Sequence, residues 1–235
     1  MIIIPARLAS NRFPRKVLVP IHSVPMVIAT AQRVKELDDV LIATDAPEVV
    51  KVAEEYGFKA VMTSADHQSG TDRINEAAEA LNLSDDDVVI NVQADEPFIE
   101  PEVVAQLIAR VKEMSTPFKM ASCYRLMHPD FATDPNHVKV VVDAQGYAIY
   151  FSRSKIPYDR EEHRDYYGHL GLYGFDRKSL REFCSFPTAP IENIEKLEQL
   201  RALYYGKKIA MVAVESRSFG IDSPEDLERA LEELA

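Results

Sequence analysis

Four cationic side chains lie close together near the start of the chain: Arg7, Arg12, Arg15 and Lys16. They follow an apolar run, residues 1–4, that predicts a buried strand of a parallel sheet. Open α/β sheets bind ligands at the carboxyl ends of their strands, where this loop would lie. Arginine and lysine suit phosphate oxygens, and the loop lacks the glycines of a Walker A or dinucleotide loop. The pattern predicts a polyphosphate site held by side chains, with a solvated basic loop as the alternative.

A carboxylate pair, Asp95 and Glu96, follows another apolar run at residues 88–92. If that run is a central strand, Asp95 lies at its carboxyl tip and faces the basic loop. Capping of the next helix explains Asp95 poorly, because Pro101 is the favoured first helical residue and Asp95 lies well before it. Mg²⁺ needs only one or two protein carboxylates where phosphates supply other ligands. Asp95 is therefore a candidate magnesium ligand.

A second candidate ligand, Asp222, stands just before the last predicted helix. Ser223, Pro224 and Asp226 match a helix N-cap, a first helical proline and the partner of a capping box. Asp222 then lies outside the helix, at a position where an apolar side chain is usual. A residue that breaks a local rule often serves function. We therefore predict that Asp222 shares the magnesium ion with Asp95.

Polar residues around the first half of the predicted sheet have both structural and functional explanations. Thr71 is a plausible N-cap for a helix over residues 71–81. Arg73, in the same turn, either reaches a ligand carboxylate or lies exposed. Asp45 is best explained as a cap for the helix that begins at Pro47.

The second half offers three further polar candidates. His169 begins a predicted strand, where a hydrogen-bonded structural histidine is the commoner role. Glu195 and Gln199 are spaced to lie on one face of a helix predicted over residues 191–205. A solvated helix face explains both without any ligand.

Composition excludes several classes of protein. The 235 residues carry a formal net charge of −11 and give a pI near 5.1, which argues against nucleic-acid binding and against a polybasic membrane surface. No apolar run approaches the roughly 20 residues of a membrane helix, and we expect no signal peptide. Cys123 and Cys184 lack metal-ligand spacing, so we expect free thiols and a cytoplasmic protein. No Ser–His–Asp order, zinc spacing or CxxC motif supports acyl transfer or zinc chemistry.

Apolar runs alternate with helical patterns, which predicts βαβ units in a mixed, mostly parallel central sheet with helices on both faces. Strands are predicted at residues 1–4, 40–44, 59–63, 88–92, 138–142, 147–151, 169–175 and 209–214. Helices are predicted at residues 47–56, 71–81, 101–114, 178–184 and 191–205, and from residue 224. A turn signal at residues 143–146 predicts a hairpin. We expect one domain over residues 1–235, with a small antiparallel lobe within residues 117–175.

Motifs spread over the whole chain carry a family resemblance. They are residues 5–16, 64–73, 91–97, 138–160, 169–174, 197–201 and 220–227. Together they resemble the 3-deoxy-manno-octulosonate (Kdo) cytidylyltransferases of Gram-negative bacteria, whereas the first and third alone indicate only the wider nucleotidyltransferase class. The resemblance implies a nucleotide-diphospho-sugar transferase fold, a homodimer and a requirement for Mg²⁺.

The resemblance also implies roles for individual residues. The phosphates of CTP would be bound by Arg7, Ser10 and Lys16, and the nucleotide placed by Gln93. The catalytic set would be Lys16, Asp95 and Asp222, with Mg²⁺ held by the two aspartates. The sugar acid would be surrounded by Arg73, Arg153, Arg160, His169, Glu195 and Gln199.

The chain departs from the family pattern at a few positions. Ala94 and Arg15 stand where the family usually has glycine, and Asn11 stands where it has serine or threonine. We expect Ala94 to tighten the pocket or alter the choice of sugar, and Arg15 to add a charge near the triphosphate. The resemblance implies attack of the anomeric hydroxyl of Kdo on the α-phosphorus of CTP, giving CMP-Kdo and pyrophosphate for lipopolysaccharide synthesis. Alternatives are a cytidylyltransferase for 8-amino-Kdo or sialic acid, and a non-catalytic nucleotide-binding protein of the same fold.

Overall fold

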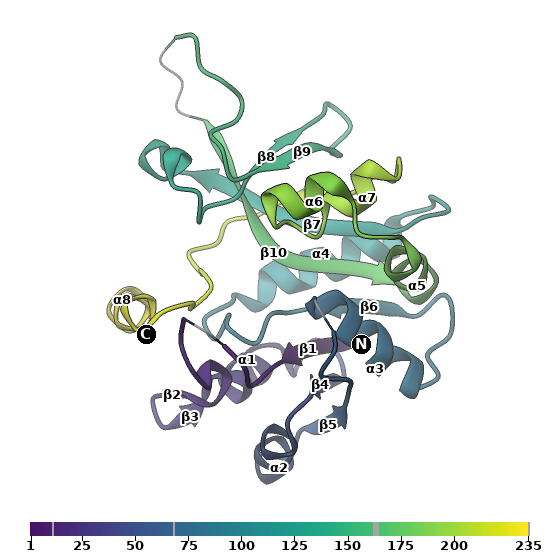
Figure 1. Ribbon diagram of the computed structural model, residues 1–235, viewed down its shortest axis with the longest axis vertical. Helices are drawn as coiled ribbons and strands as arrows, with labels where there is room; N and C mark the ends of the chain where they lie inside the picture. Colours follow the sequence, from purple (N-terminus) through teal and green to yellow (C-terminus); the bar gives the residue numbers. More distant parts are fainter. Residues whose placement is uncertain (11, 68, 162–164, 235) are drawn as a thin grey trace.

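A nine-stranded mixed sheet runs through the molecule in the computed structural model, which describes residues 1–10, 12–67, 69–161 and 165–234 (Figure 1). The main path of the sheet is β11–β7–β10–β6–β1–β4–β5, and β8 and β9 extend it from β10. The strands of this sheet are β1 Ile2–Ala6, β4 Val40–Thr44, β5 Lys59–Met62, β6 Val88–Asn91, β7 Met120–Met127, β8 Lys139–Val142, β9 Ala148–Ser152, β10 Tyr166–Asp176 and β11 Ala210–Ala213. A separate antiparallel pair is formed by β2 Pro20–Ile21 and β3 Val24–Pro25.

The parallel half of the sheet places the predicted ligand loops at one edge. β1 pairs in parallel with β4 and with β6, and β4 pairs in parallel with β5. The loops after β1 and β6, which carry the cations and Asp95, therefore leave the sheet on the same side. The prediction of βαβ units in a mixed, mostly parallel sheet is confirmed.

Helices cover both faces of the sheet because successive residues of the apolar strands point to opposite faces. Ile2 and Ile4 of β1 pack in one buried cluster with α1, α2 and α4, and Ile3 packs in another with α3, α5 and α7. The helices are α1 Met26–Val34, α2 Pro47–Glu55, α3 Gly70–Ala80, α4 Pro101–Glu113, α5 Arg177–Ser185, α6 Pro190–Glu195, α7 Leu200–Tyr204 and α8 Pro224–Glu233. Short 3-10 turns occupy η1 Lys16–Leu18 and η2 Pro129–Thr133.

The predicted antiparallel lobe is present, and β10 joins it to the parallel half. β10 pairs antiparallel with β6 at one end and with β7 along most of its length, and it meets β8 at Gly168. β8 and β9 form the predicted hairpin, which stands at the far end of the molecule from α2 and β5 (Figure 1). The register of β10 against β7 shifts between Leu170 and Tyr173.

The single helix predicted over residues 191–205 is wrong. The chain forms α6 and α7 instead, and Lys196 between them adopts the left-handed conformation with φ of 54°. The apolar stripe that suggested one helix is real, because Leu197 and Leu200 are buried. The turn, however, directs Glu198 and Gln199 toward a cavity beside β10.

Two predicted helix caps are also wrong. Ser69 rather than Thr71 caps α3, because its hydroxyl accepts a hydrogen bond from the Asp72 amide. The N-cap of α2 is Ala46, which has no side-chain cap, and Asp45 accepts a hydrogen bond from Arg73. The predicted cap of the last helix is confirmed, since Ser223 and Asp226 form a reciprocal capping box.

The expectation of free thiols is confirmed. Cys123 and Cys184 are free thiols, the first buried and the second half-buried. Within the described ranges, no helix combines the length and the apolarity needed to cross a membrane.

Candidate active site

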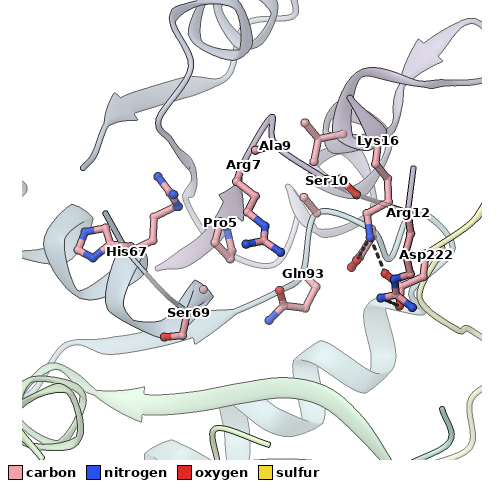
Figure 2. Close-up of a pocket in the computed structure, with 15 residues that line it drawn as sticks. Pro5, Arg7, Ala9, Ser10, Arg12, Lys16, His67, Ser69, Gln93 and Asp222 are labelled. Carbon is pink, nitrogen blue, oxygen red and sulfur yellow. Dashed lines mark hydrogen bonds and ion pairs between the residues drawn. The ribbon is translucent and has the colours of Figure 1, made fainter. Parts of the chain in front are cut away.

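A cavity of about 450 Å³ opens at the carboxyl ends of β1 and β6 (Figure 2). The predicted site residues that line it are Arg7, Ser10, Lys16, Arg73, Gln93, Asp95 and Asp222. Residues far apart in sequence therefore meet in one place, because the β1 loop, the β6 loop, the start of α3 and the segment before α8 converge there. In Figure 2, Lys16, Arg12 and Asp222 gather at one end of the cavity and His67 lies at the other.

Lys16 joins the two predicted metal ligands. Its Nζ donates to Asp95 Oδ2 at 2.6 Å and to Asp222 Oδ1 at 2.8 Å. Arg12 forms an ion pair with the other Asp222 oxygen at 2.8 Å. Burial disfavours the charge of Lys16, but the attraction of Asp95 and the hydrogen bonds to both carboxylates outweigh it and raise the pKa of Lys16. Burial acts against the Asp222 charge too, yet Lys16 and Arg12 hold the pKa of Asp222 below its usual value.

The donor set at this point fits a magnesium ion carried in with a nucleotide. Asp95 and Asp222 both reach a single cationic nitrogen, so their oxygens can converge on one cation. Across the described ranges of the chain, no group of three or more His, Cys, Asp or Glu side chains forms a metal cage. Two carboxylates suffice for Mg²⁺ when phosphate oxygens and water complete the octahedron. A tightly held structural metal would need more protein ligands.

The cations of the basic loop have different roles. Arg7 is exposed, lines the cavity and has no hydrogen bond or ion pair with another described residue. Arg15 turns away from this cavity and pairs with Glu48 on α2. The expectation that Arg15 adds a charge to the cavity is therefore wrong. The Arg15 φ of 58° lies in the left-handed region, which glycine adopts without strain.

The remaining residues of the first cavity shape its walls. Ser10 accepts a hydrogen bond from the Phe13 amide, which helps to hold the turn of the loop. Gln93 lies near Asn91 and the Gly171 carbonyl, between β6 and β10. Arg73 is buried and already donates to Thr63 at 2.6 Å and to Asp45 at 3.0 Å, so the geometry ties much of its guanidinium to the protein.

A second, larger cavity of about 860 Å³ lies beside β10 and the turn between α6 and α7. Arg153, His169 and Gln199, which were predicted to surround a sugar acid, line this cavity together. Arg12 and Asp222 line both cavities, so the two spaces meet at these two side chains. This junction is where a group held in one cavity could react with a group held in the other.

His169 is held as a neutral ring. Its Nε2 lies 2.8 Å from the Ser122 hydroxyl, and its Nδ1 lies 3.5 Å from the Gln199 amide nitrogen. Tyr173 donates to the Gln199 amide oxygen at 3.0 Å, which fixes the orientation of that amide. Burial lowers the pKa of His169 to about 3, so the ring offers hydrogen bonds rather than charge at neutral pH.

Two predicted sugar-binding residues lie elsewhere. Glu195 accepts hydrogen bonds from the Ser152 hydroxyl at 2.6 Å and from the Arg153 amide at 2.9 Å, and it lines neither cavity. Arg160 is exposed and lines neither cavity. Glu198 lines the second cavity in place of Glu195, and it accepts a hydrogen bond from Thr71 at 2.7 Å.

Sequence reasoning gave no role to Glu96, Arg125 or Ser218, which line the second cavity. Glu96 is buried, accepts a hydrogen bond from Ser218 at 2.7 Å and lines the second cavity. Burial raises the pKa of Glu96 to about 7. Arg125 and Ser218 line the same cavity from β7 and from the segment before α8. Only the adjacency of Glu96 to Asp95 could have drawn attention to this group, because its partners are remote in sequence.

Comparisons with known proteins agree with this geometry. The family model for cytidylyltransferases matches residues 1–209. The chain is 57% identical to the 3-deoxy-manno-octulosonate cytidylyltransferase of Nitratiruptor sp. over 235 residues, covering 97% of each chain. It is 52% identical to the protein of the same name from Wolinella succinogenes over 238 residues, covering 98% of each.

Solved structures give the same family. A CMP:2-keto-3-deoxy-manno-octonic acid synthetase in complex with CTP superposes with a TM-score of 0.90 at 36% identity, covering 98% of this chain and 96% of that one. A cytidylyltransferase from Leptospira borgpetersenii, at 16% identity and a TM-score of 0.63 over 97% and 82% of the two chains, shares the fold. The site and the fold are those of a nucleotidyltransferase enzyme. The chain belongs to the cytidylyltransferase family and, within it, to the 3-deoxy-manno-octulosonate cytidylyltransferases.

Proposed function

We propose that this chain transfers CMP from CTP to the anomeric hydroxyl of Kdo and releases pyrophosphate. The observation that carries the proposal is the junction of the two cavities at Arg12 and Asp222. A nucleotide in the first cavity and a sugar acid in the second would bring their reacting groups to the same carboxylate, Asp222. Relatives named for this reaction, and a relative solved with CTP, support the assignment of substrates.

The first cavity has the cations that a triphosphate needs. Arg7 has no ion pair with another described residue, so its guanidinium is available for a phosphate oxygen. Lys16 would exchange its carboxylate partners for phosphate oxygens when nucleotide binds. Arg12 neutralises part of the charge of Asp222 at the junction. Positioning and charge neutralisation supply most of the catalysis in such transfers.

Asp95 and Asp222 would hold Mg²⁺ once Lys16 has moved to the phosphates. When bound, Mg²⁺ neutralises phosphate charge and lowers the pKa of a hydroxyl beside it. The two aspartates come from the β6 loop and from the segment before α8, so they approach the junction from different sides. No side-chain base is needed in this scheme.

The second cavity presents hydrogen-bonding groups to a sugar acid. His169 is neutral and Gln199 is oriented by Tyr173, so both suit sugar hydroxyls. Arg153 contributes a cation to the wall, although its guanidinium also donates to the backbone carbonyls of Glu195 and Pro135. The chemistry of this wall fits a polyhydroxylated acid.

The wider setting follows from the same reaction. We propose a cytoplasmic enzyme, because CTP is a cytoplasmic substrate, and a role in lipopolysaccharide synthesis. We also propose a homodimer formed through the antiparallel lobe, where Leu126 and Tyr167 face each other across β7 and β10 and are 65% and 38% exposed. An apolar pair on the surface of a strand pair favours contact with another protein surface.

The experiment is pyrophosphate release with CTP and Mg²⁺, in the absence of sugar and with Kdo, 8-amino-Kdo or sialic acid. We expect release that depends on both Mg²⁺ and Kdo. Pyrophosphate release with 8-amino-Kdo or sialic acid, but not with Kdo, would support the proposed reaction and contradict the choice of sugar. Binding of CTP without release from any of the three would favour a non-catalytic nucleotide-binding protein.

A further inference from the structure

The segment that carries Asp222 has no secondary structure of its own. After β11 ends at Ala213, residues 214–222 form neither helix nor strand until α8 begins at Pro224. Such a segment places a side chain accurately only if other groups fix its backbone. The question is therefore what holds Asp222 opposite Asp95.

Two carboxylates of the β6 loop bind this segment at successive points. Glu100 accepts hydrogen bonds from the Ser216 hydroxyl at 2.7 Å and from the Arg217 amide at 2.8 Å. Glu96 accepts one from the Ser218 hydroxyl at 2.7 Å. Glu96 is 8% exposed and Ser218 is fully buried, so water competes little for that bond. We call Glu96, Glu100, Ser216 and Ser218 the carboxylate clamp.

Neighbouring contacts continue the clamp on both sides. The Ile221 amide donates to the Asp95 carbonyl at 2.9 Å, directly before Asp222. Arg125 of β7 donates to the Ser216 carbonyl at 2.7 Å. Arg125 and Glu96 line the same cavity. The segment is thus fixed from Ser216 to Asp222.

The clamp ties both candidate metal ligands to one loop. Asp95 belongs to the loop after β6, and Glu96 and Glu100 belong to the same loop. That loop therefore supplies one ligand directly and sets the position of the other through the clamp. A change in the clamp would alter the separation of Asp95 and Asp222 without touching either side chain.

We propose that Glu96 and Glu100 are positioning residues for the Asp95–Asp222 pair. This inference rests on the proposed function, in which that pair holds Mg²⁺ beside CTP. The clamp residues do not contact the ion in this scheme; they keep two carboxylates from different segments convergent on it. Groups that orient metal ligands typically contribute tenfold to hundredfold to metal affinity or activity.

The test uses Ser218→Ala and Ser216→Ala, which remove a hydroxyl donor to Glu96 and to Glu100 respectively. Mn²⁺ serves as a spectroscopic substitute for Mg²⁺, and electron paramagnetic resonance measures its binding to each protein saturated with CTP. We expect Mn²⁺ affinity to fall about tenfold to hundredfold in Ser218→Ala and in the same direction in Ser216→Ala. The half-saturating Mg²⁺ concentration for turnover should rise in parallel, while KM for CTP at saturating Mg²⁺ changes less than about twofold.

A matched control removes the same kind of bond away from the carboxylate pair. Ser152→Ala deletes a buried serine hydroxyl that donates to Glu195 at 2.6 Å. We expect this variant to lose thermal stability yet to bind Mn²⁺ with the affinity of the parent. The comparison separates loss of positioning from general loosening of the fold.

Each outcome of the experiment has a defined meaning. Mn²⁺ affinity within about twofold of the parent in both clamp variants, with reduced thermal stability, would overturn the clamp and leave the proposed function in place. A parent protein that binds no Mn²⁺ with CTP would overturn the proposed metal site and the clamp with it. Ser216 is only half-buried, so its variant gives a folded comparison if Ser218→Ala is too unstable to purify.

Discussion

Lys16 stands between two carboxylates that would otherwise repel each other at the junction of the cavities. It is 12% exposed, and its ammonium replaces part of the charge that a metal would bring. Lys16 and Arg12 together balance the two carboxylates, and a triphosphate would draw Lys16 and Arg7 toward its oxygens. In the proposed scheme, cations exchange around carboxylates that stay in place.

Replacing Asp95 with asparagine tests this arrangement. The amide keeps the size of the side chain but removes the charge that holds Lys16 and the proposed ion. We expect turnover to fall by on the order of a hundredfold or more, since charge stabilisation supplies most of such a transfer. The free energy of unfolding should fall by only about 1–3 kcal/mol, the value of one hydrogen bond to a charged group. Pyrophosphate release and urea unfolding measure the two effects, and near-native turnover in limiting Mg²⁺ would contradict the scheme.

The half-buried imidazole of His169 predicts a pH dependence of stability. Its pKa of about 3 in the folded protein lies below the usual value of 6.5, so the unfolded chain binds a proton first as the pH falls. Stability from this group is therefore complete above about pH 6.5 and is lost progressively between pH 6.5 and pH 3. The loss approaches about 1.4 kcal/mol per pH unit at its steepest.

The measurement is urea unfolding of the parent and of His169→Gln between pH 7 and pH 4.5. The stability of the parent relative to the variant should fall as the pH falls, because glutamine has no proton to gain. If the difference in the free energy of unfolding between the parent and His169→Gln stayed constant over this range, the folded protein would also protonate His169 near its usual pKa.

Several site residues could be located from sequence because a strand end fixed their position. Arg7, Lys16 and Asp95 follow apolar strands, so the edge of the sheet could be predicted for each and the cavity contains all of them. The ion pair of Arg15 with Glu48 could not be predicted from sequence, because it depends on how α2 packs beside the loop. The same holds for Glu96, whose partner Ser218 comes from the other end of the chain.

At the scale of elements, periodicity predicted most strands and helices within a residue or two of their observed bounds. The break between α6 and α7 escaped prediction because Leu197 and Leu200 continue the apolar spacing of one helix. A left-handed residue at Lys196 carries no periodic signal, and lysine is not the residue that favours it. After the turn, Gln199 is buried and lies beside His169, a tertiary contact that sequence periodicity does not indicate.

Substitutions at Lys196 test the value of this turn. Lys196→Gly relieves the left-handed conformation, whereas Lys196→Val places a β-branched side chain there. We expect the valine variant to be less stable than the glycine variant by about 1–2 kcal/mol. KM for the sugar acid should rise in the valine variant while KM for CTP stays constant, because the turn borders only the second cavity. Equal changes in the KM values for the sugar acid and for CTP would show that the turn has no specific effect on sugar binding.

At the scale of the whole molecule, the exposed apolar pair on β7 and β10 predicts self-association. Tyr124 packs edge-on against Tyr167 at 4.9 Å, so the aromatic surface beside Leu126 is already ordered in one chain. We expect the parent to sediment as a dimer and Leu126→Glu to sediment as a monomer with unchanged circular dichroism. A parent that sediments as a monomer at micromolar concentration would contradict the proposed interface.

The long strand β10 limits how such an enzyme could change its substrate over evolutionary time. One end of β10 pairs with β6 in the parallel half, the other end meets β8 beside the second cavity, and β7 pairs with β10 along most of its length. The two halves are therefore not interchangeable modules, because a transplanted sugar half would bring a foreign strand into the middle of the nucleotide sheet. New specificity would have to arise by substitution within the existing walls, as at the turn between α6 and α7, rather than by recombination of whole lobes.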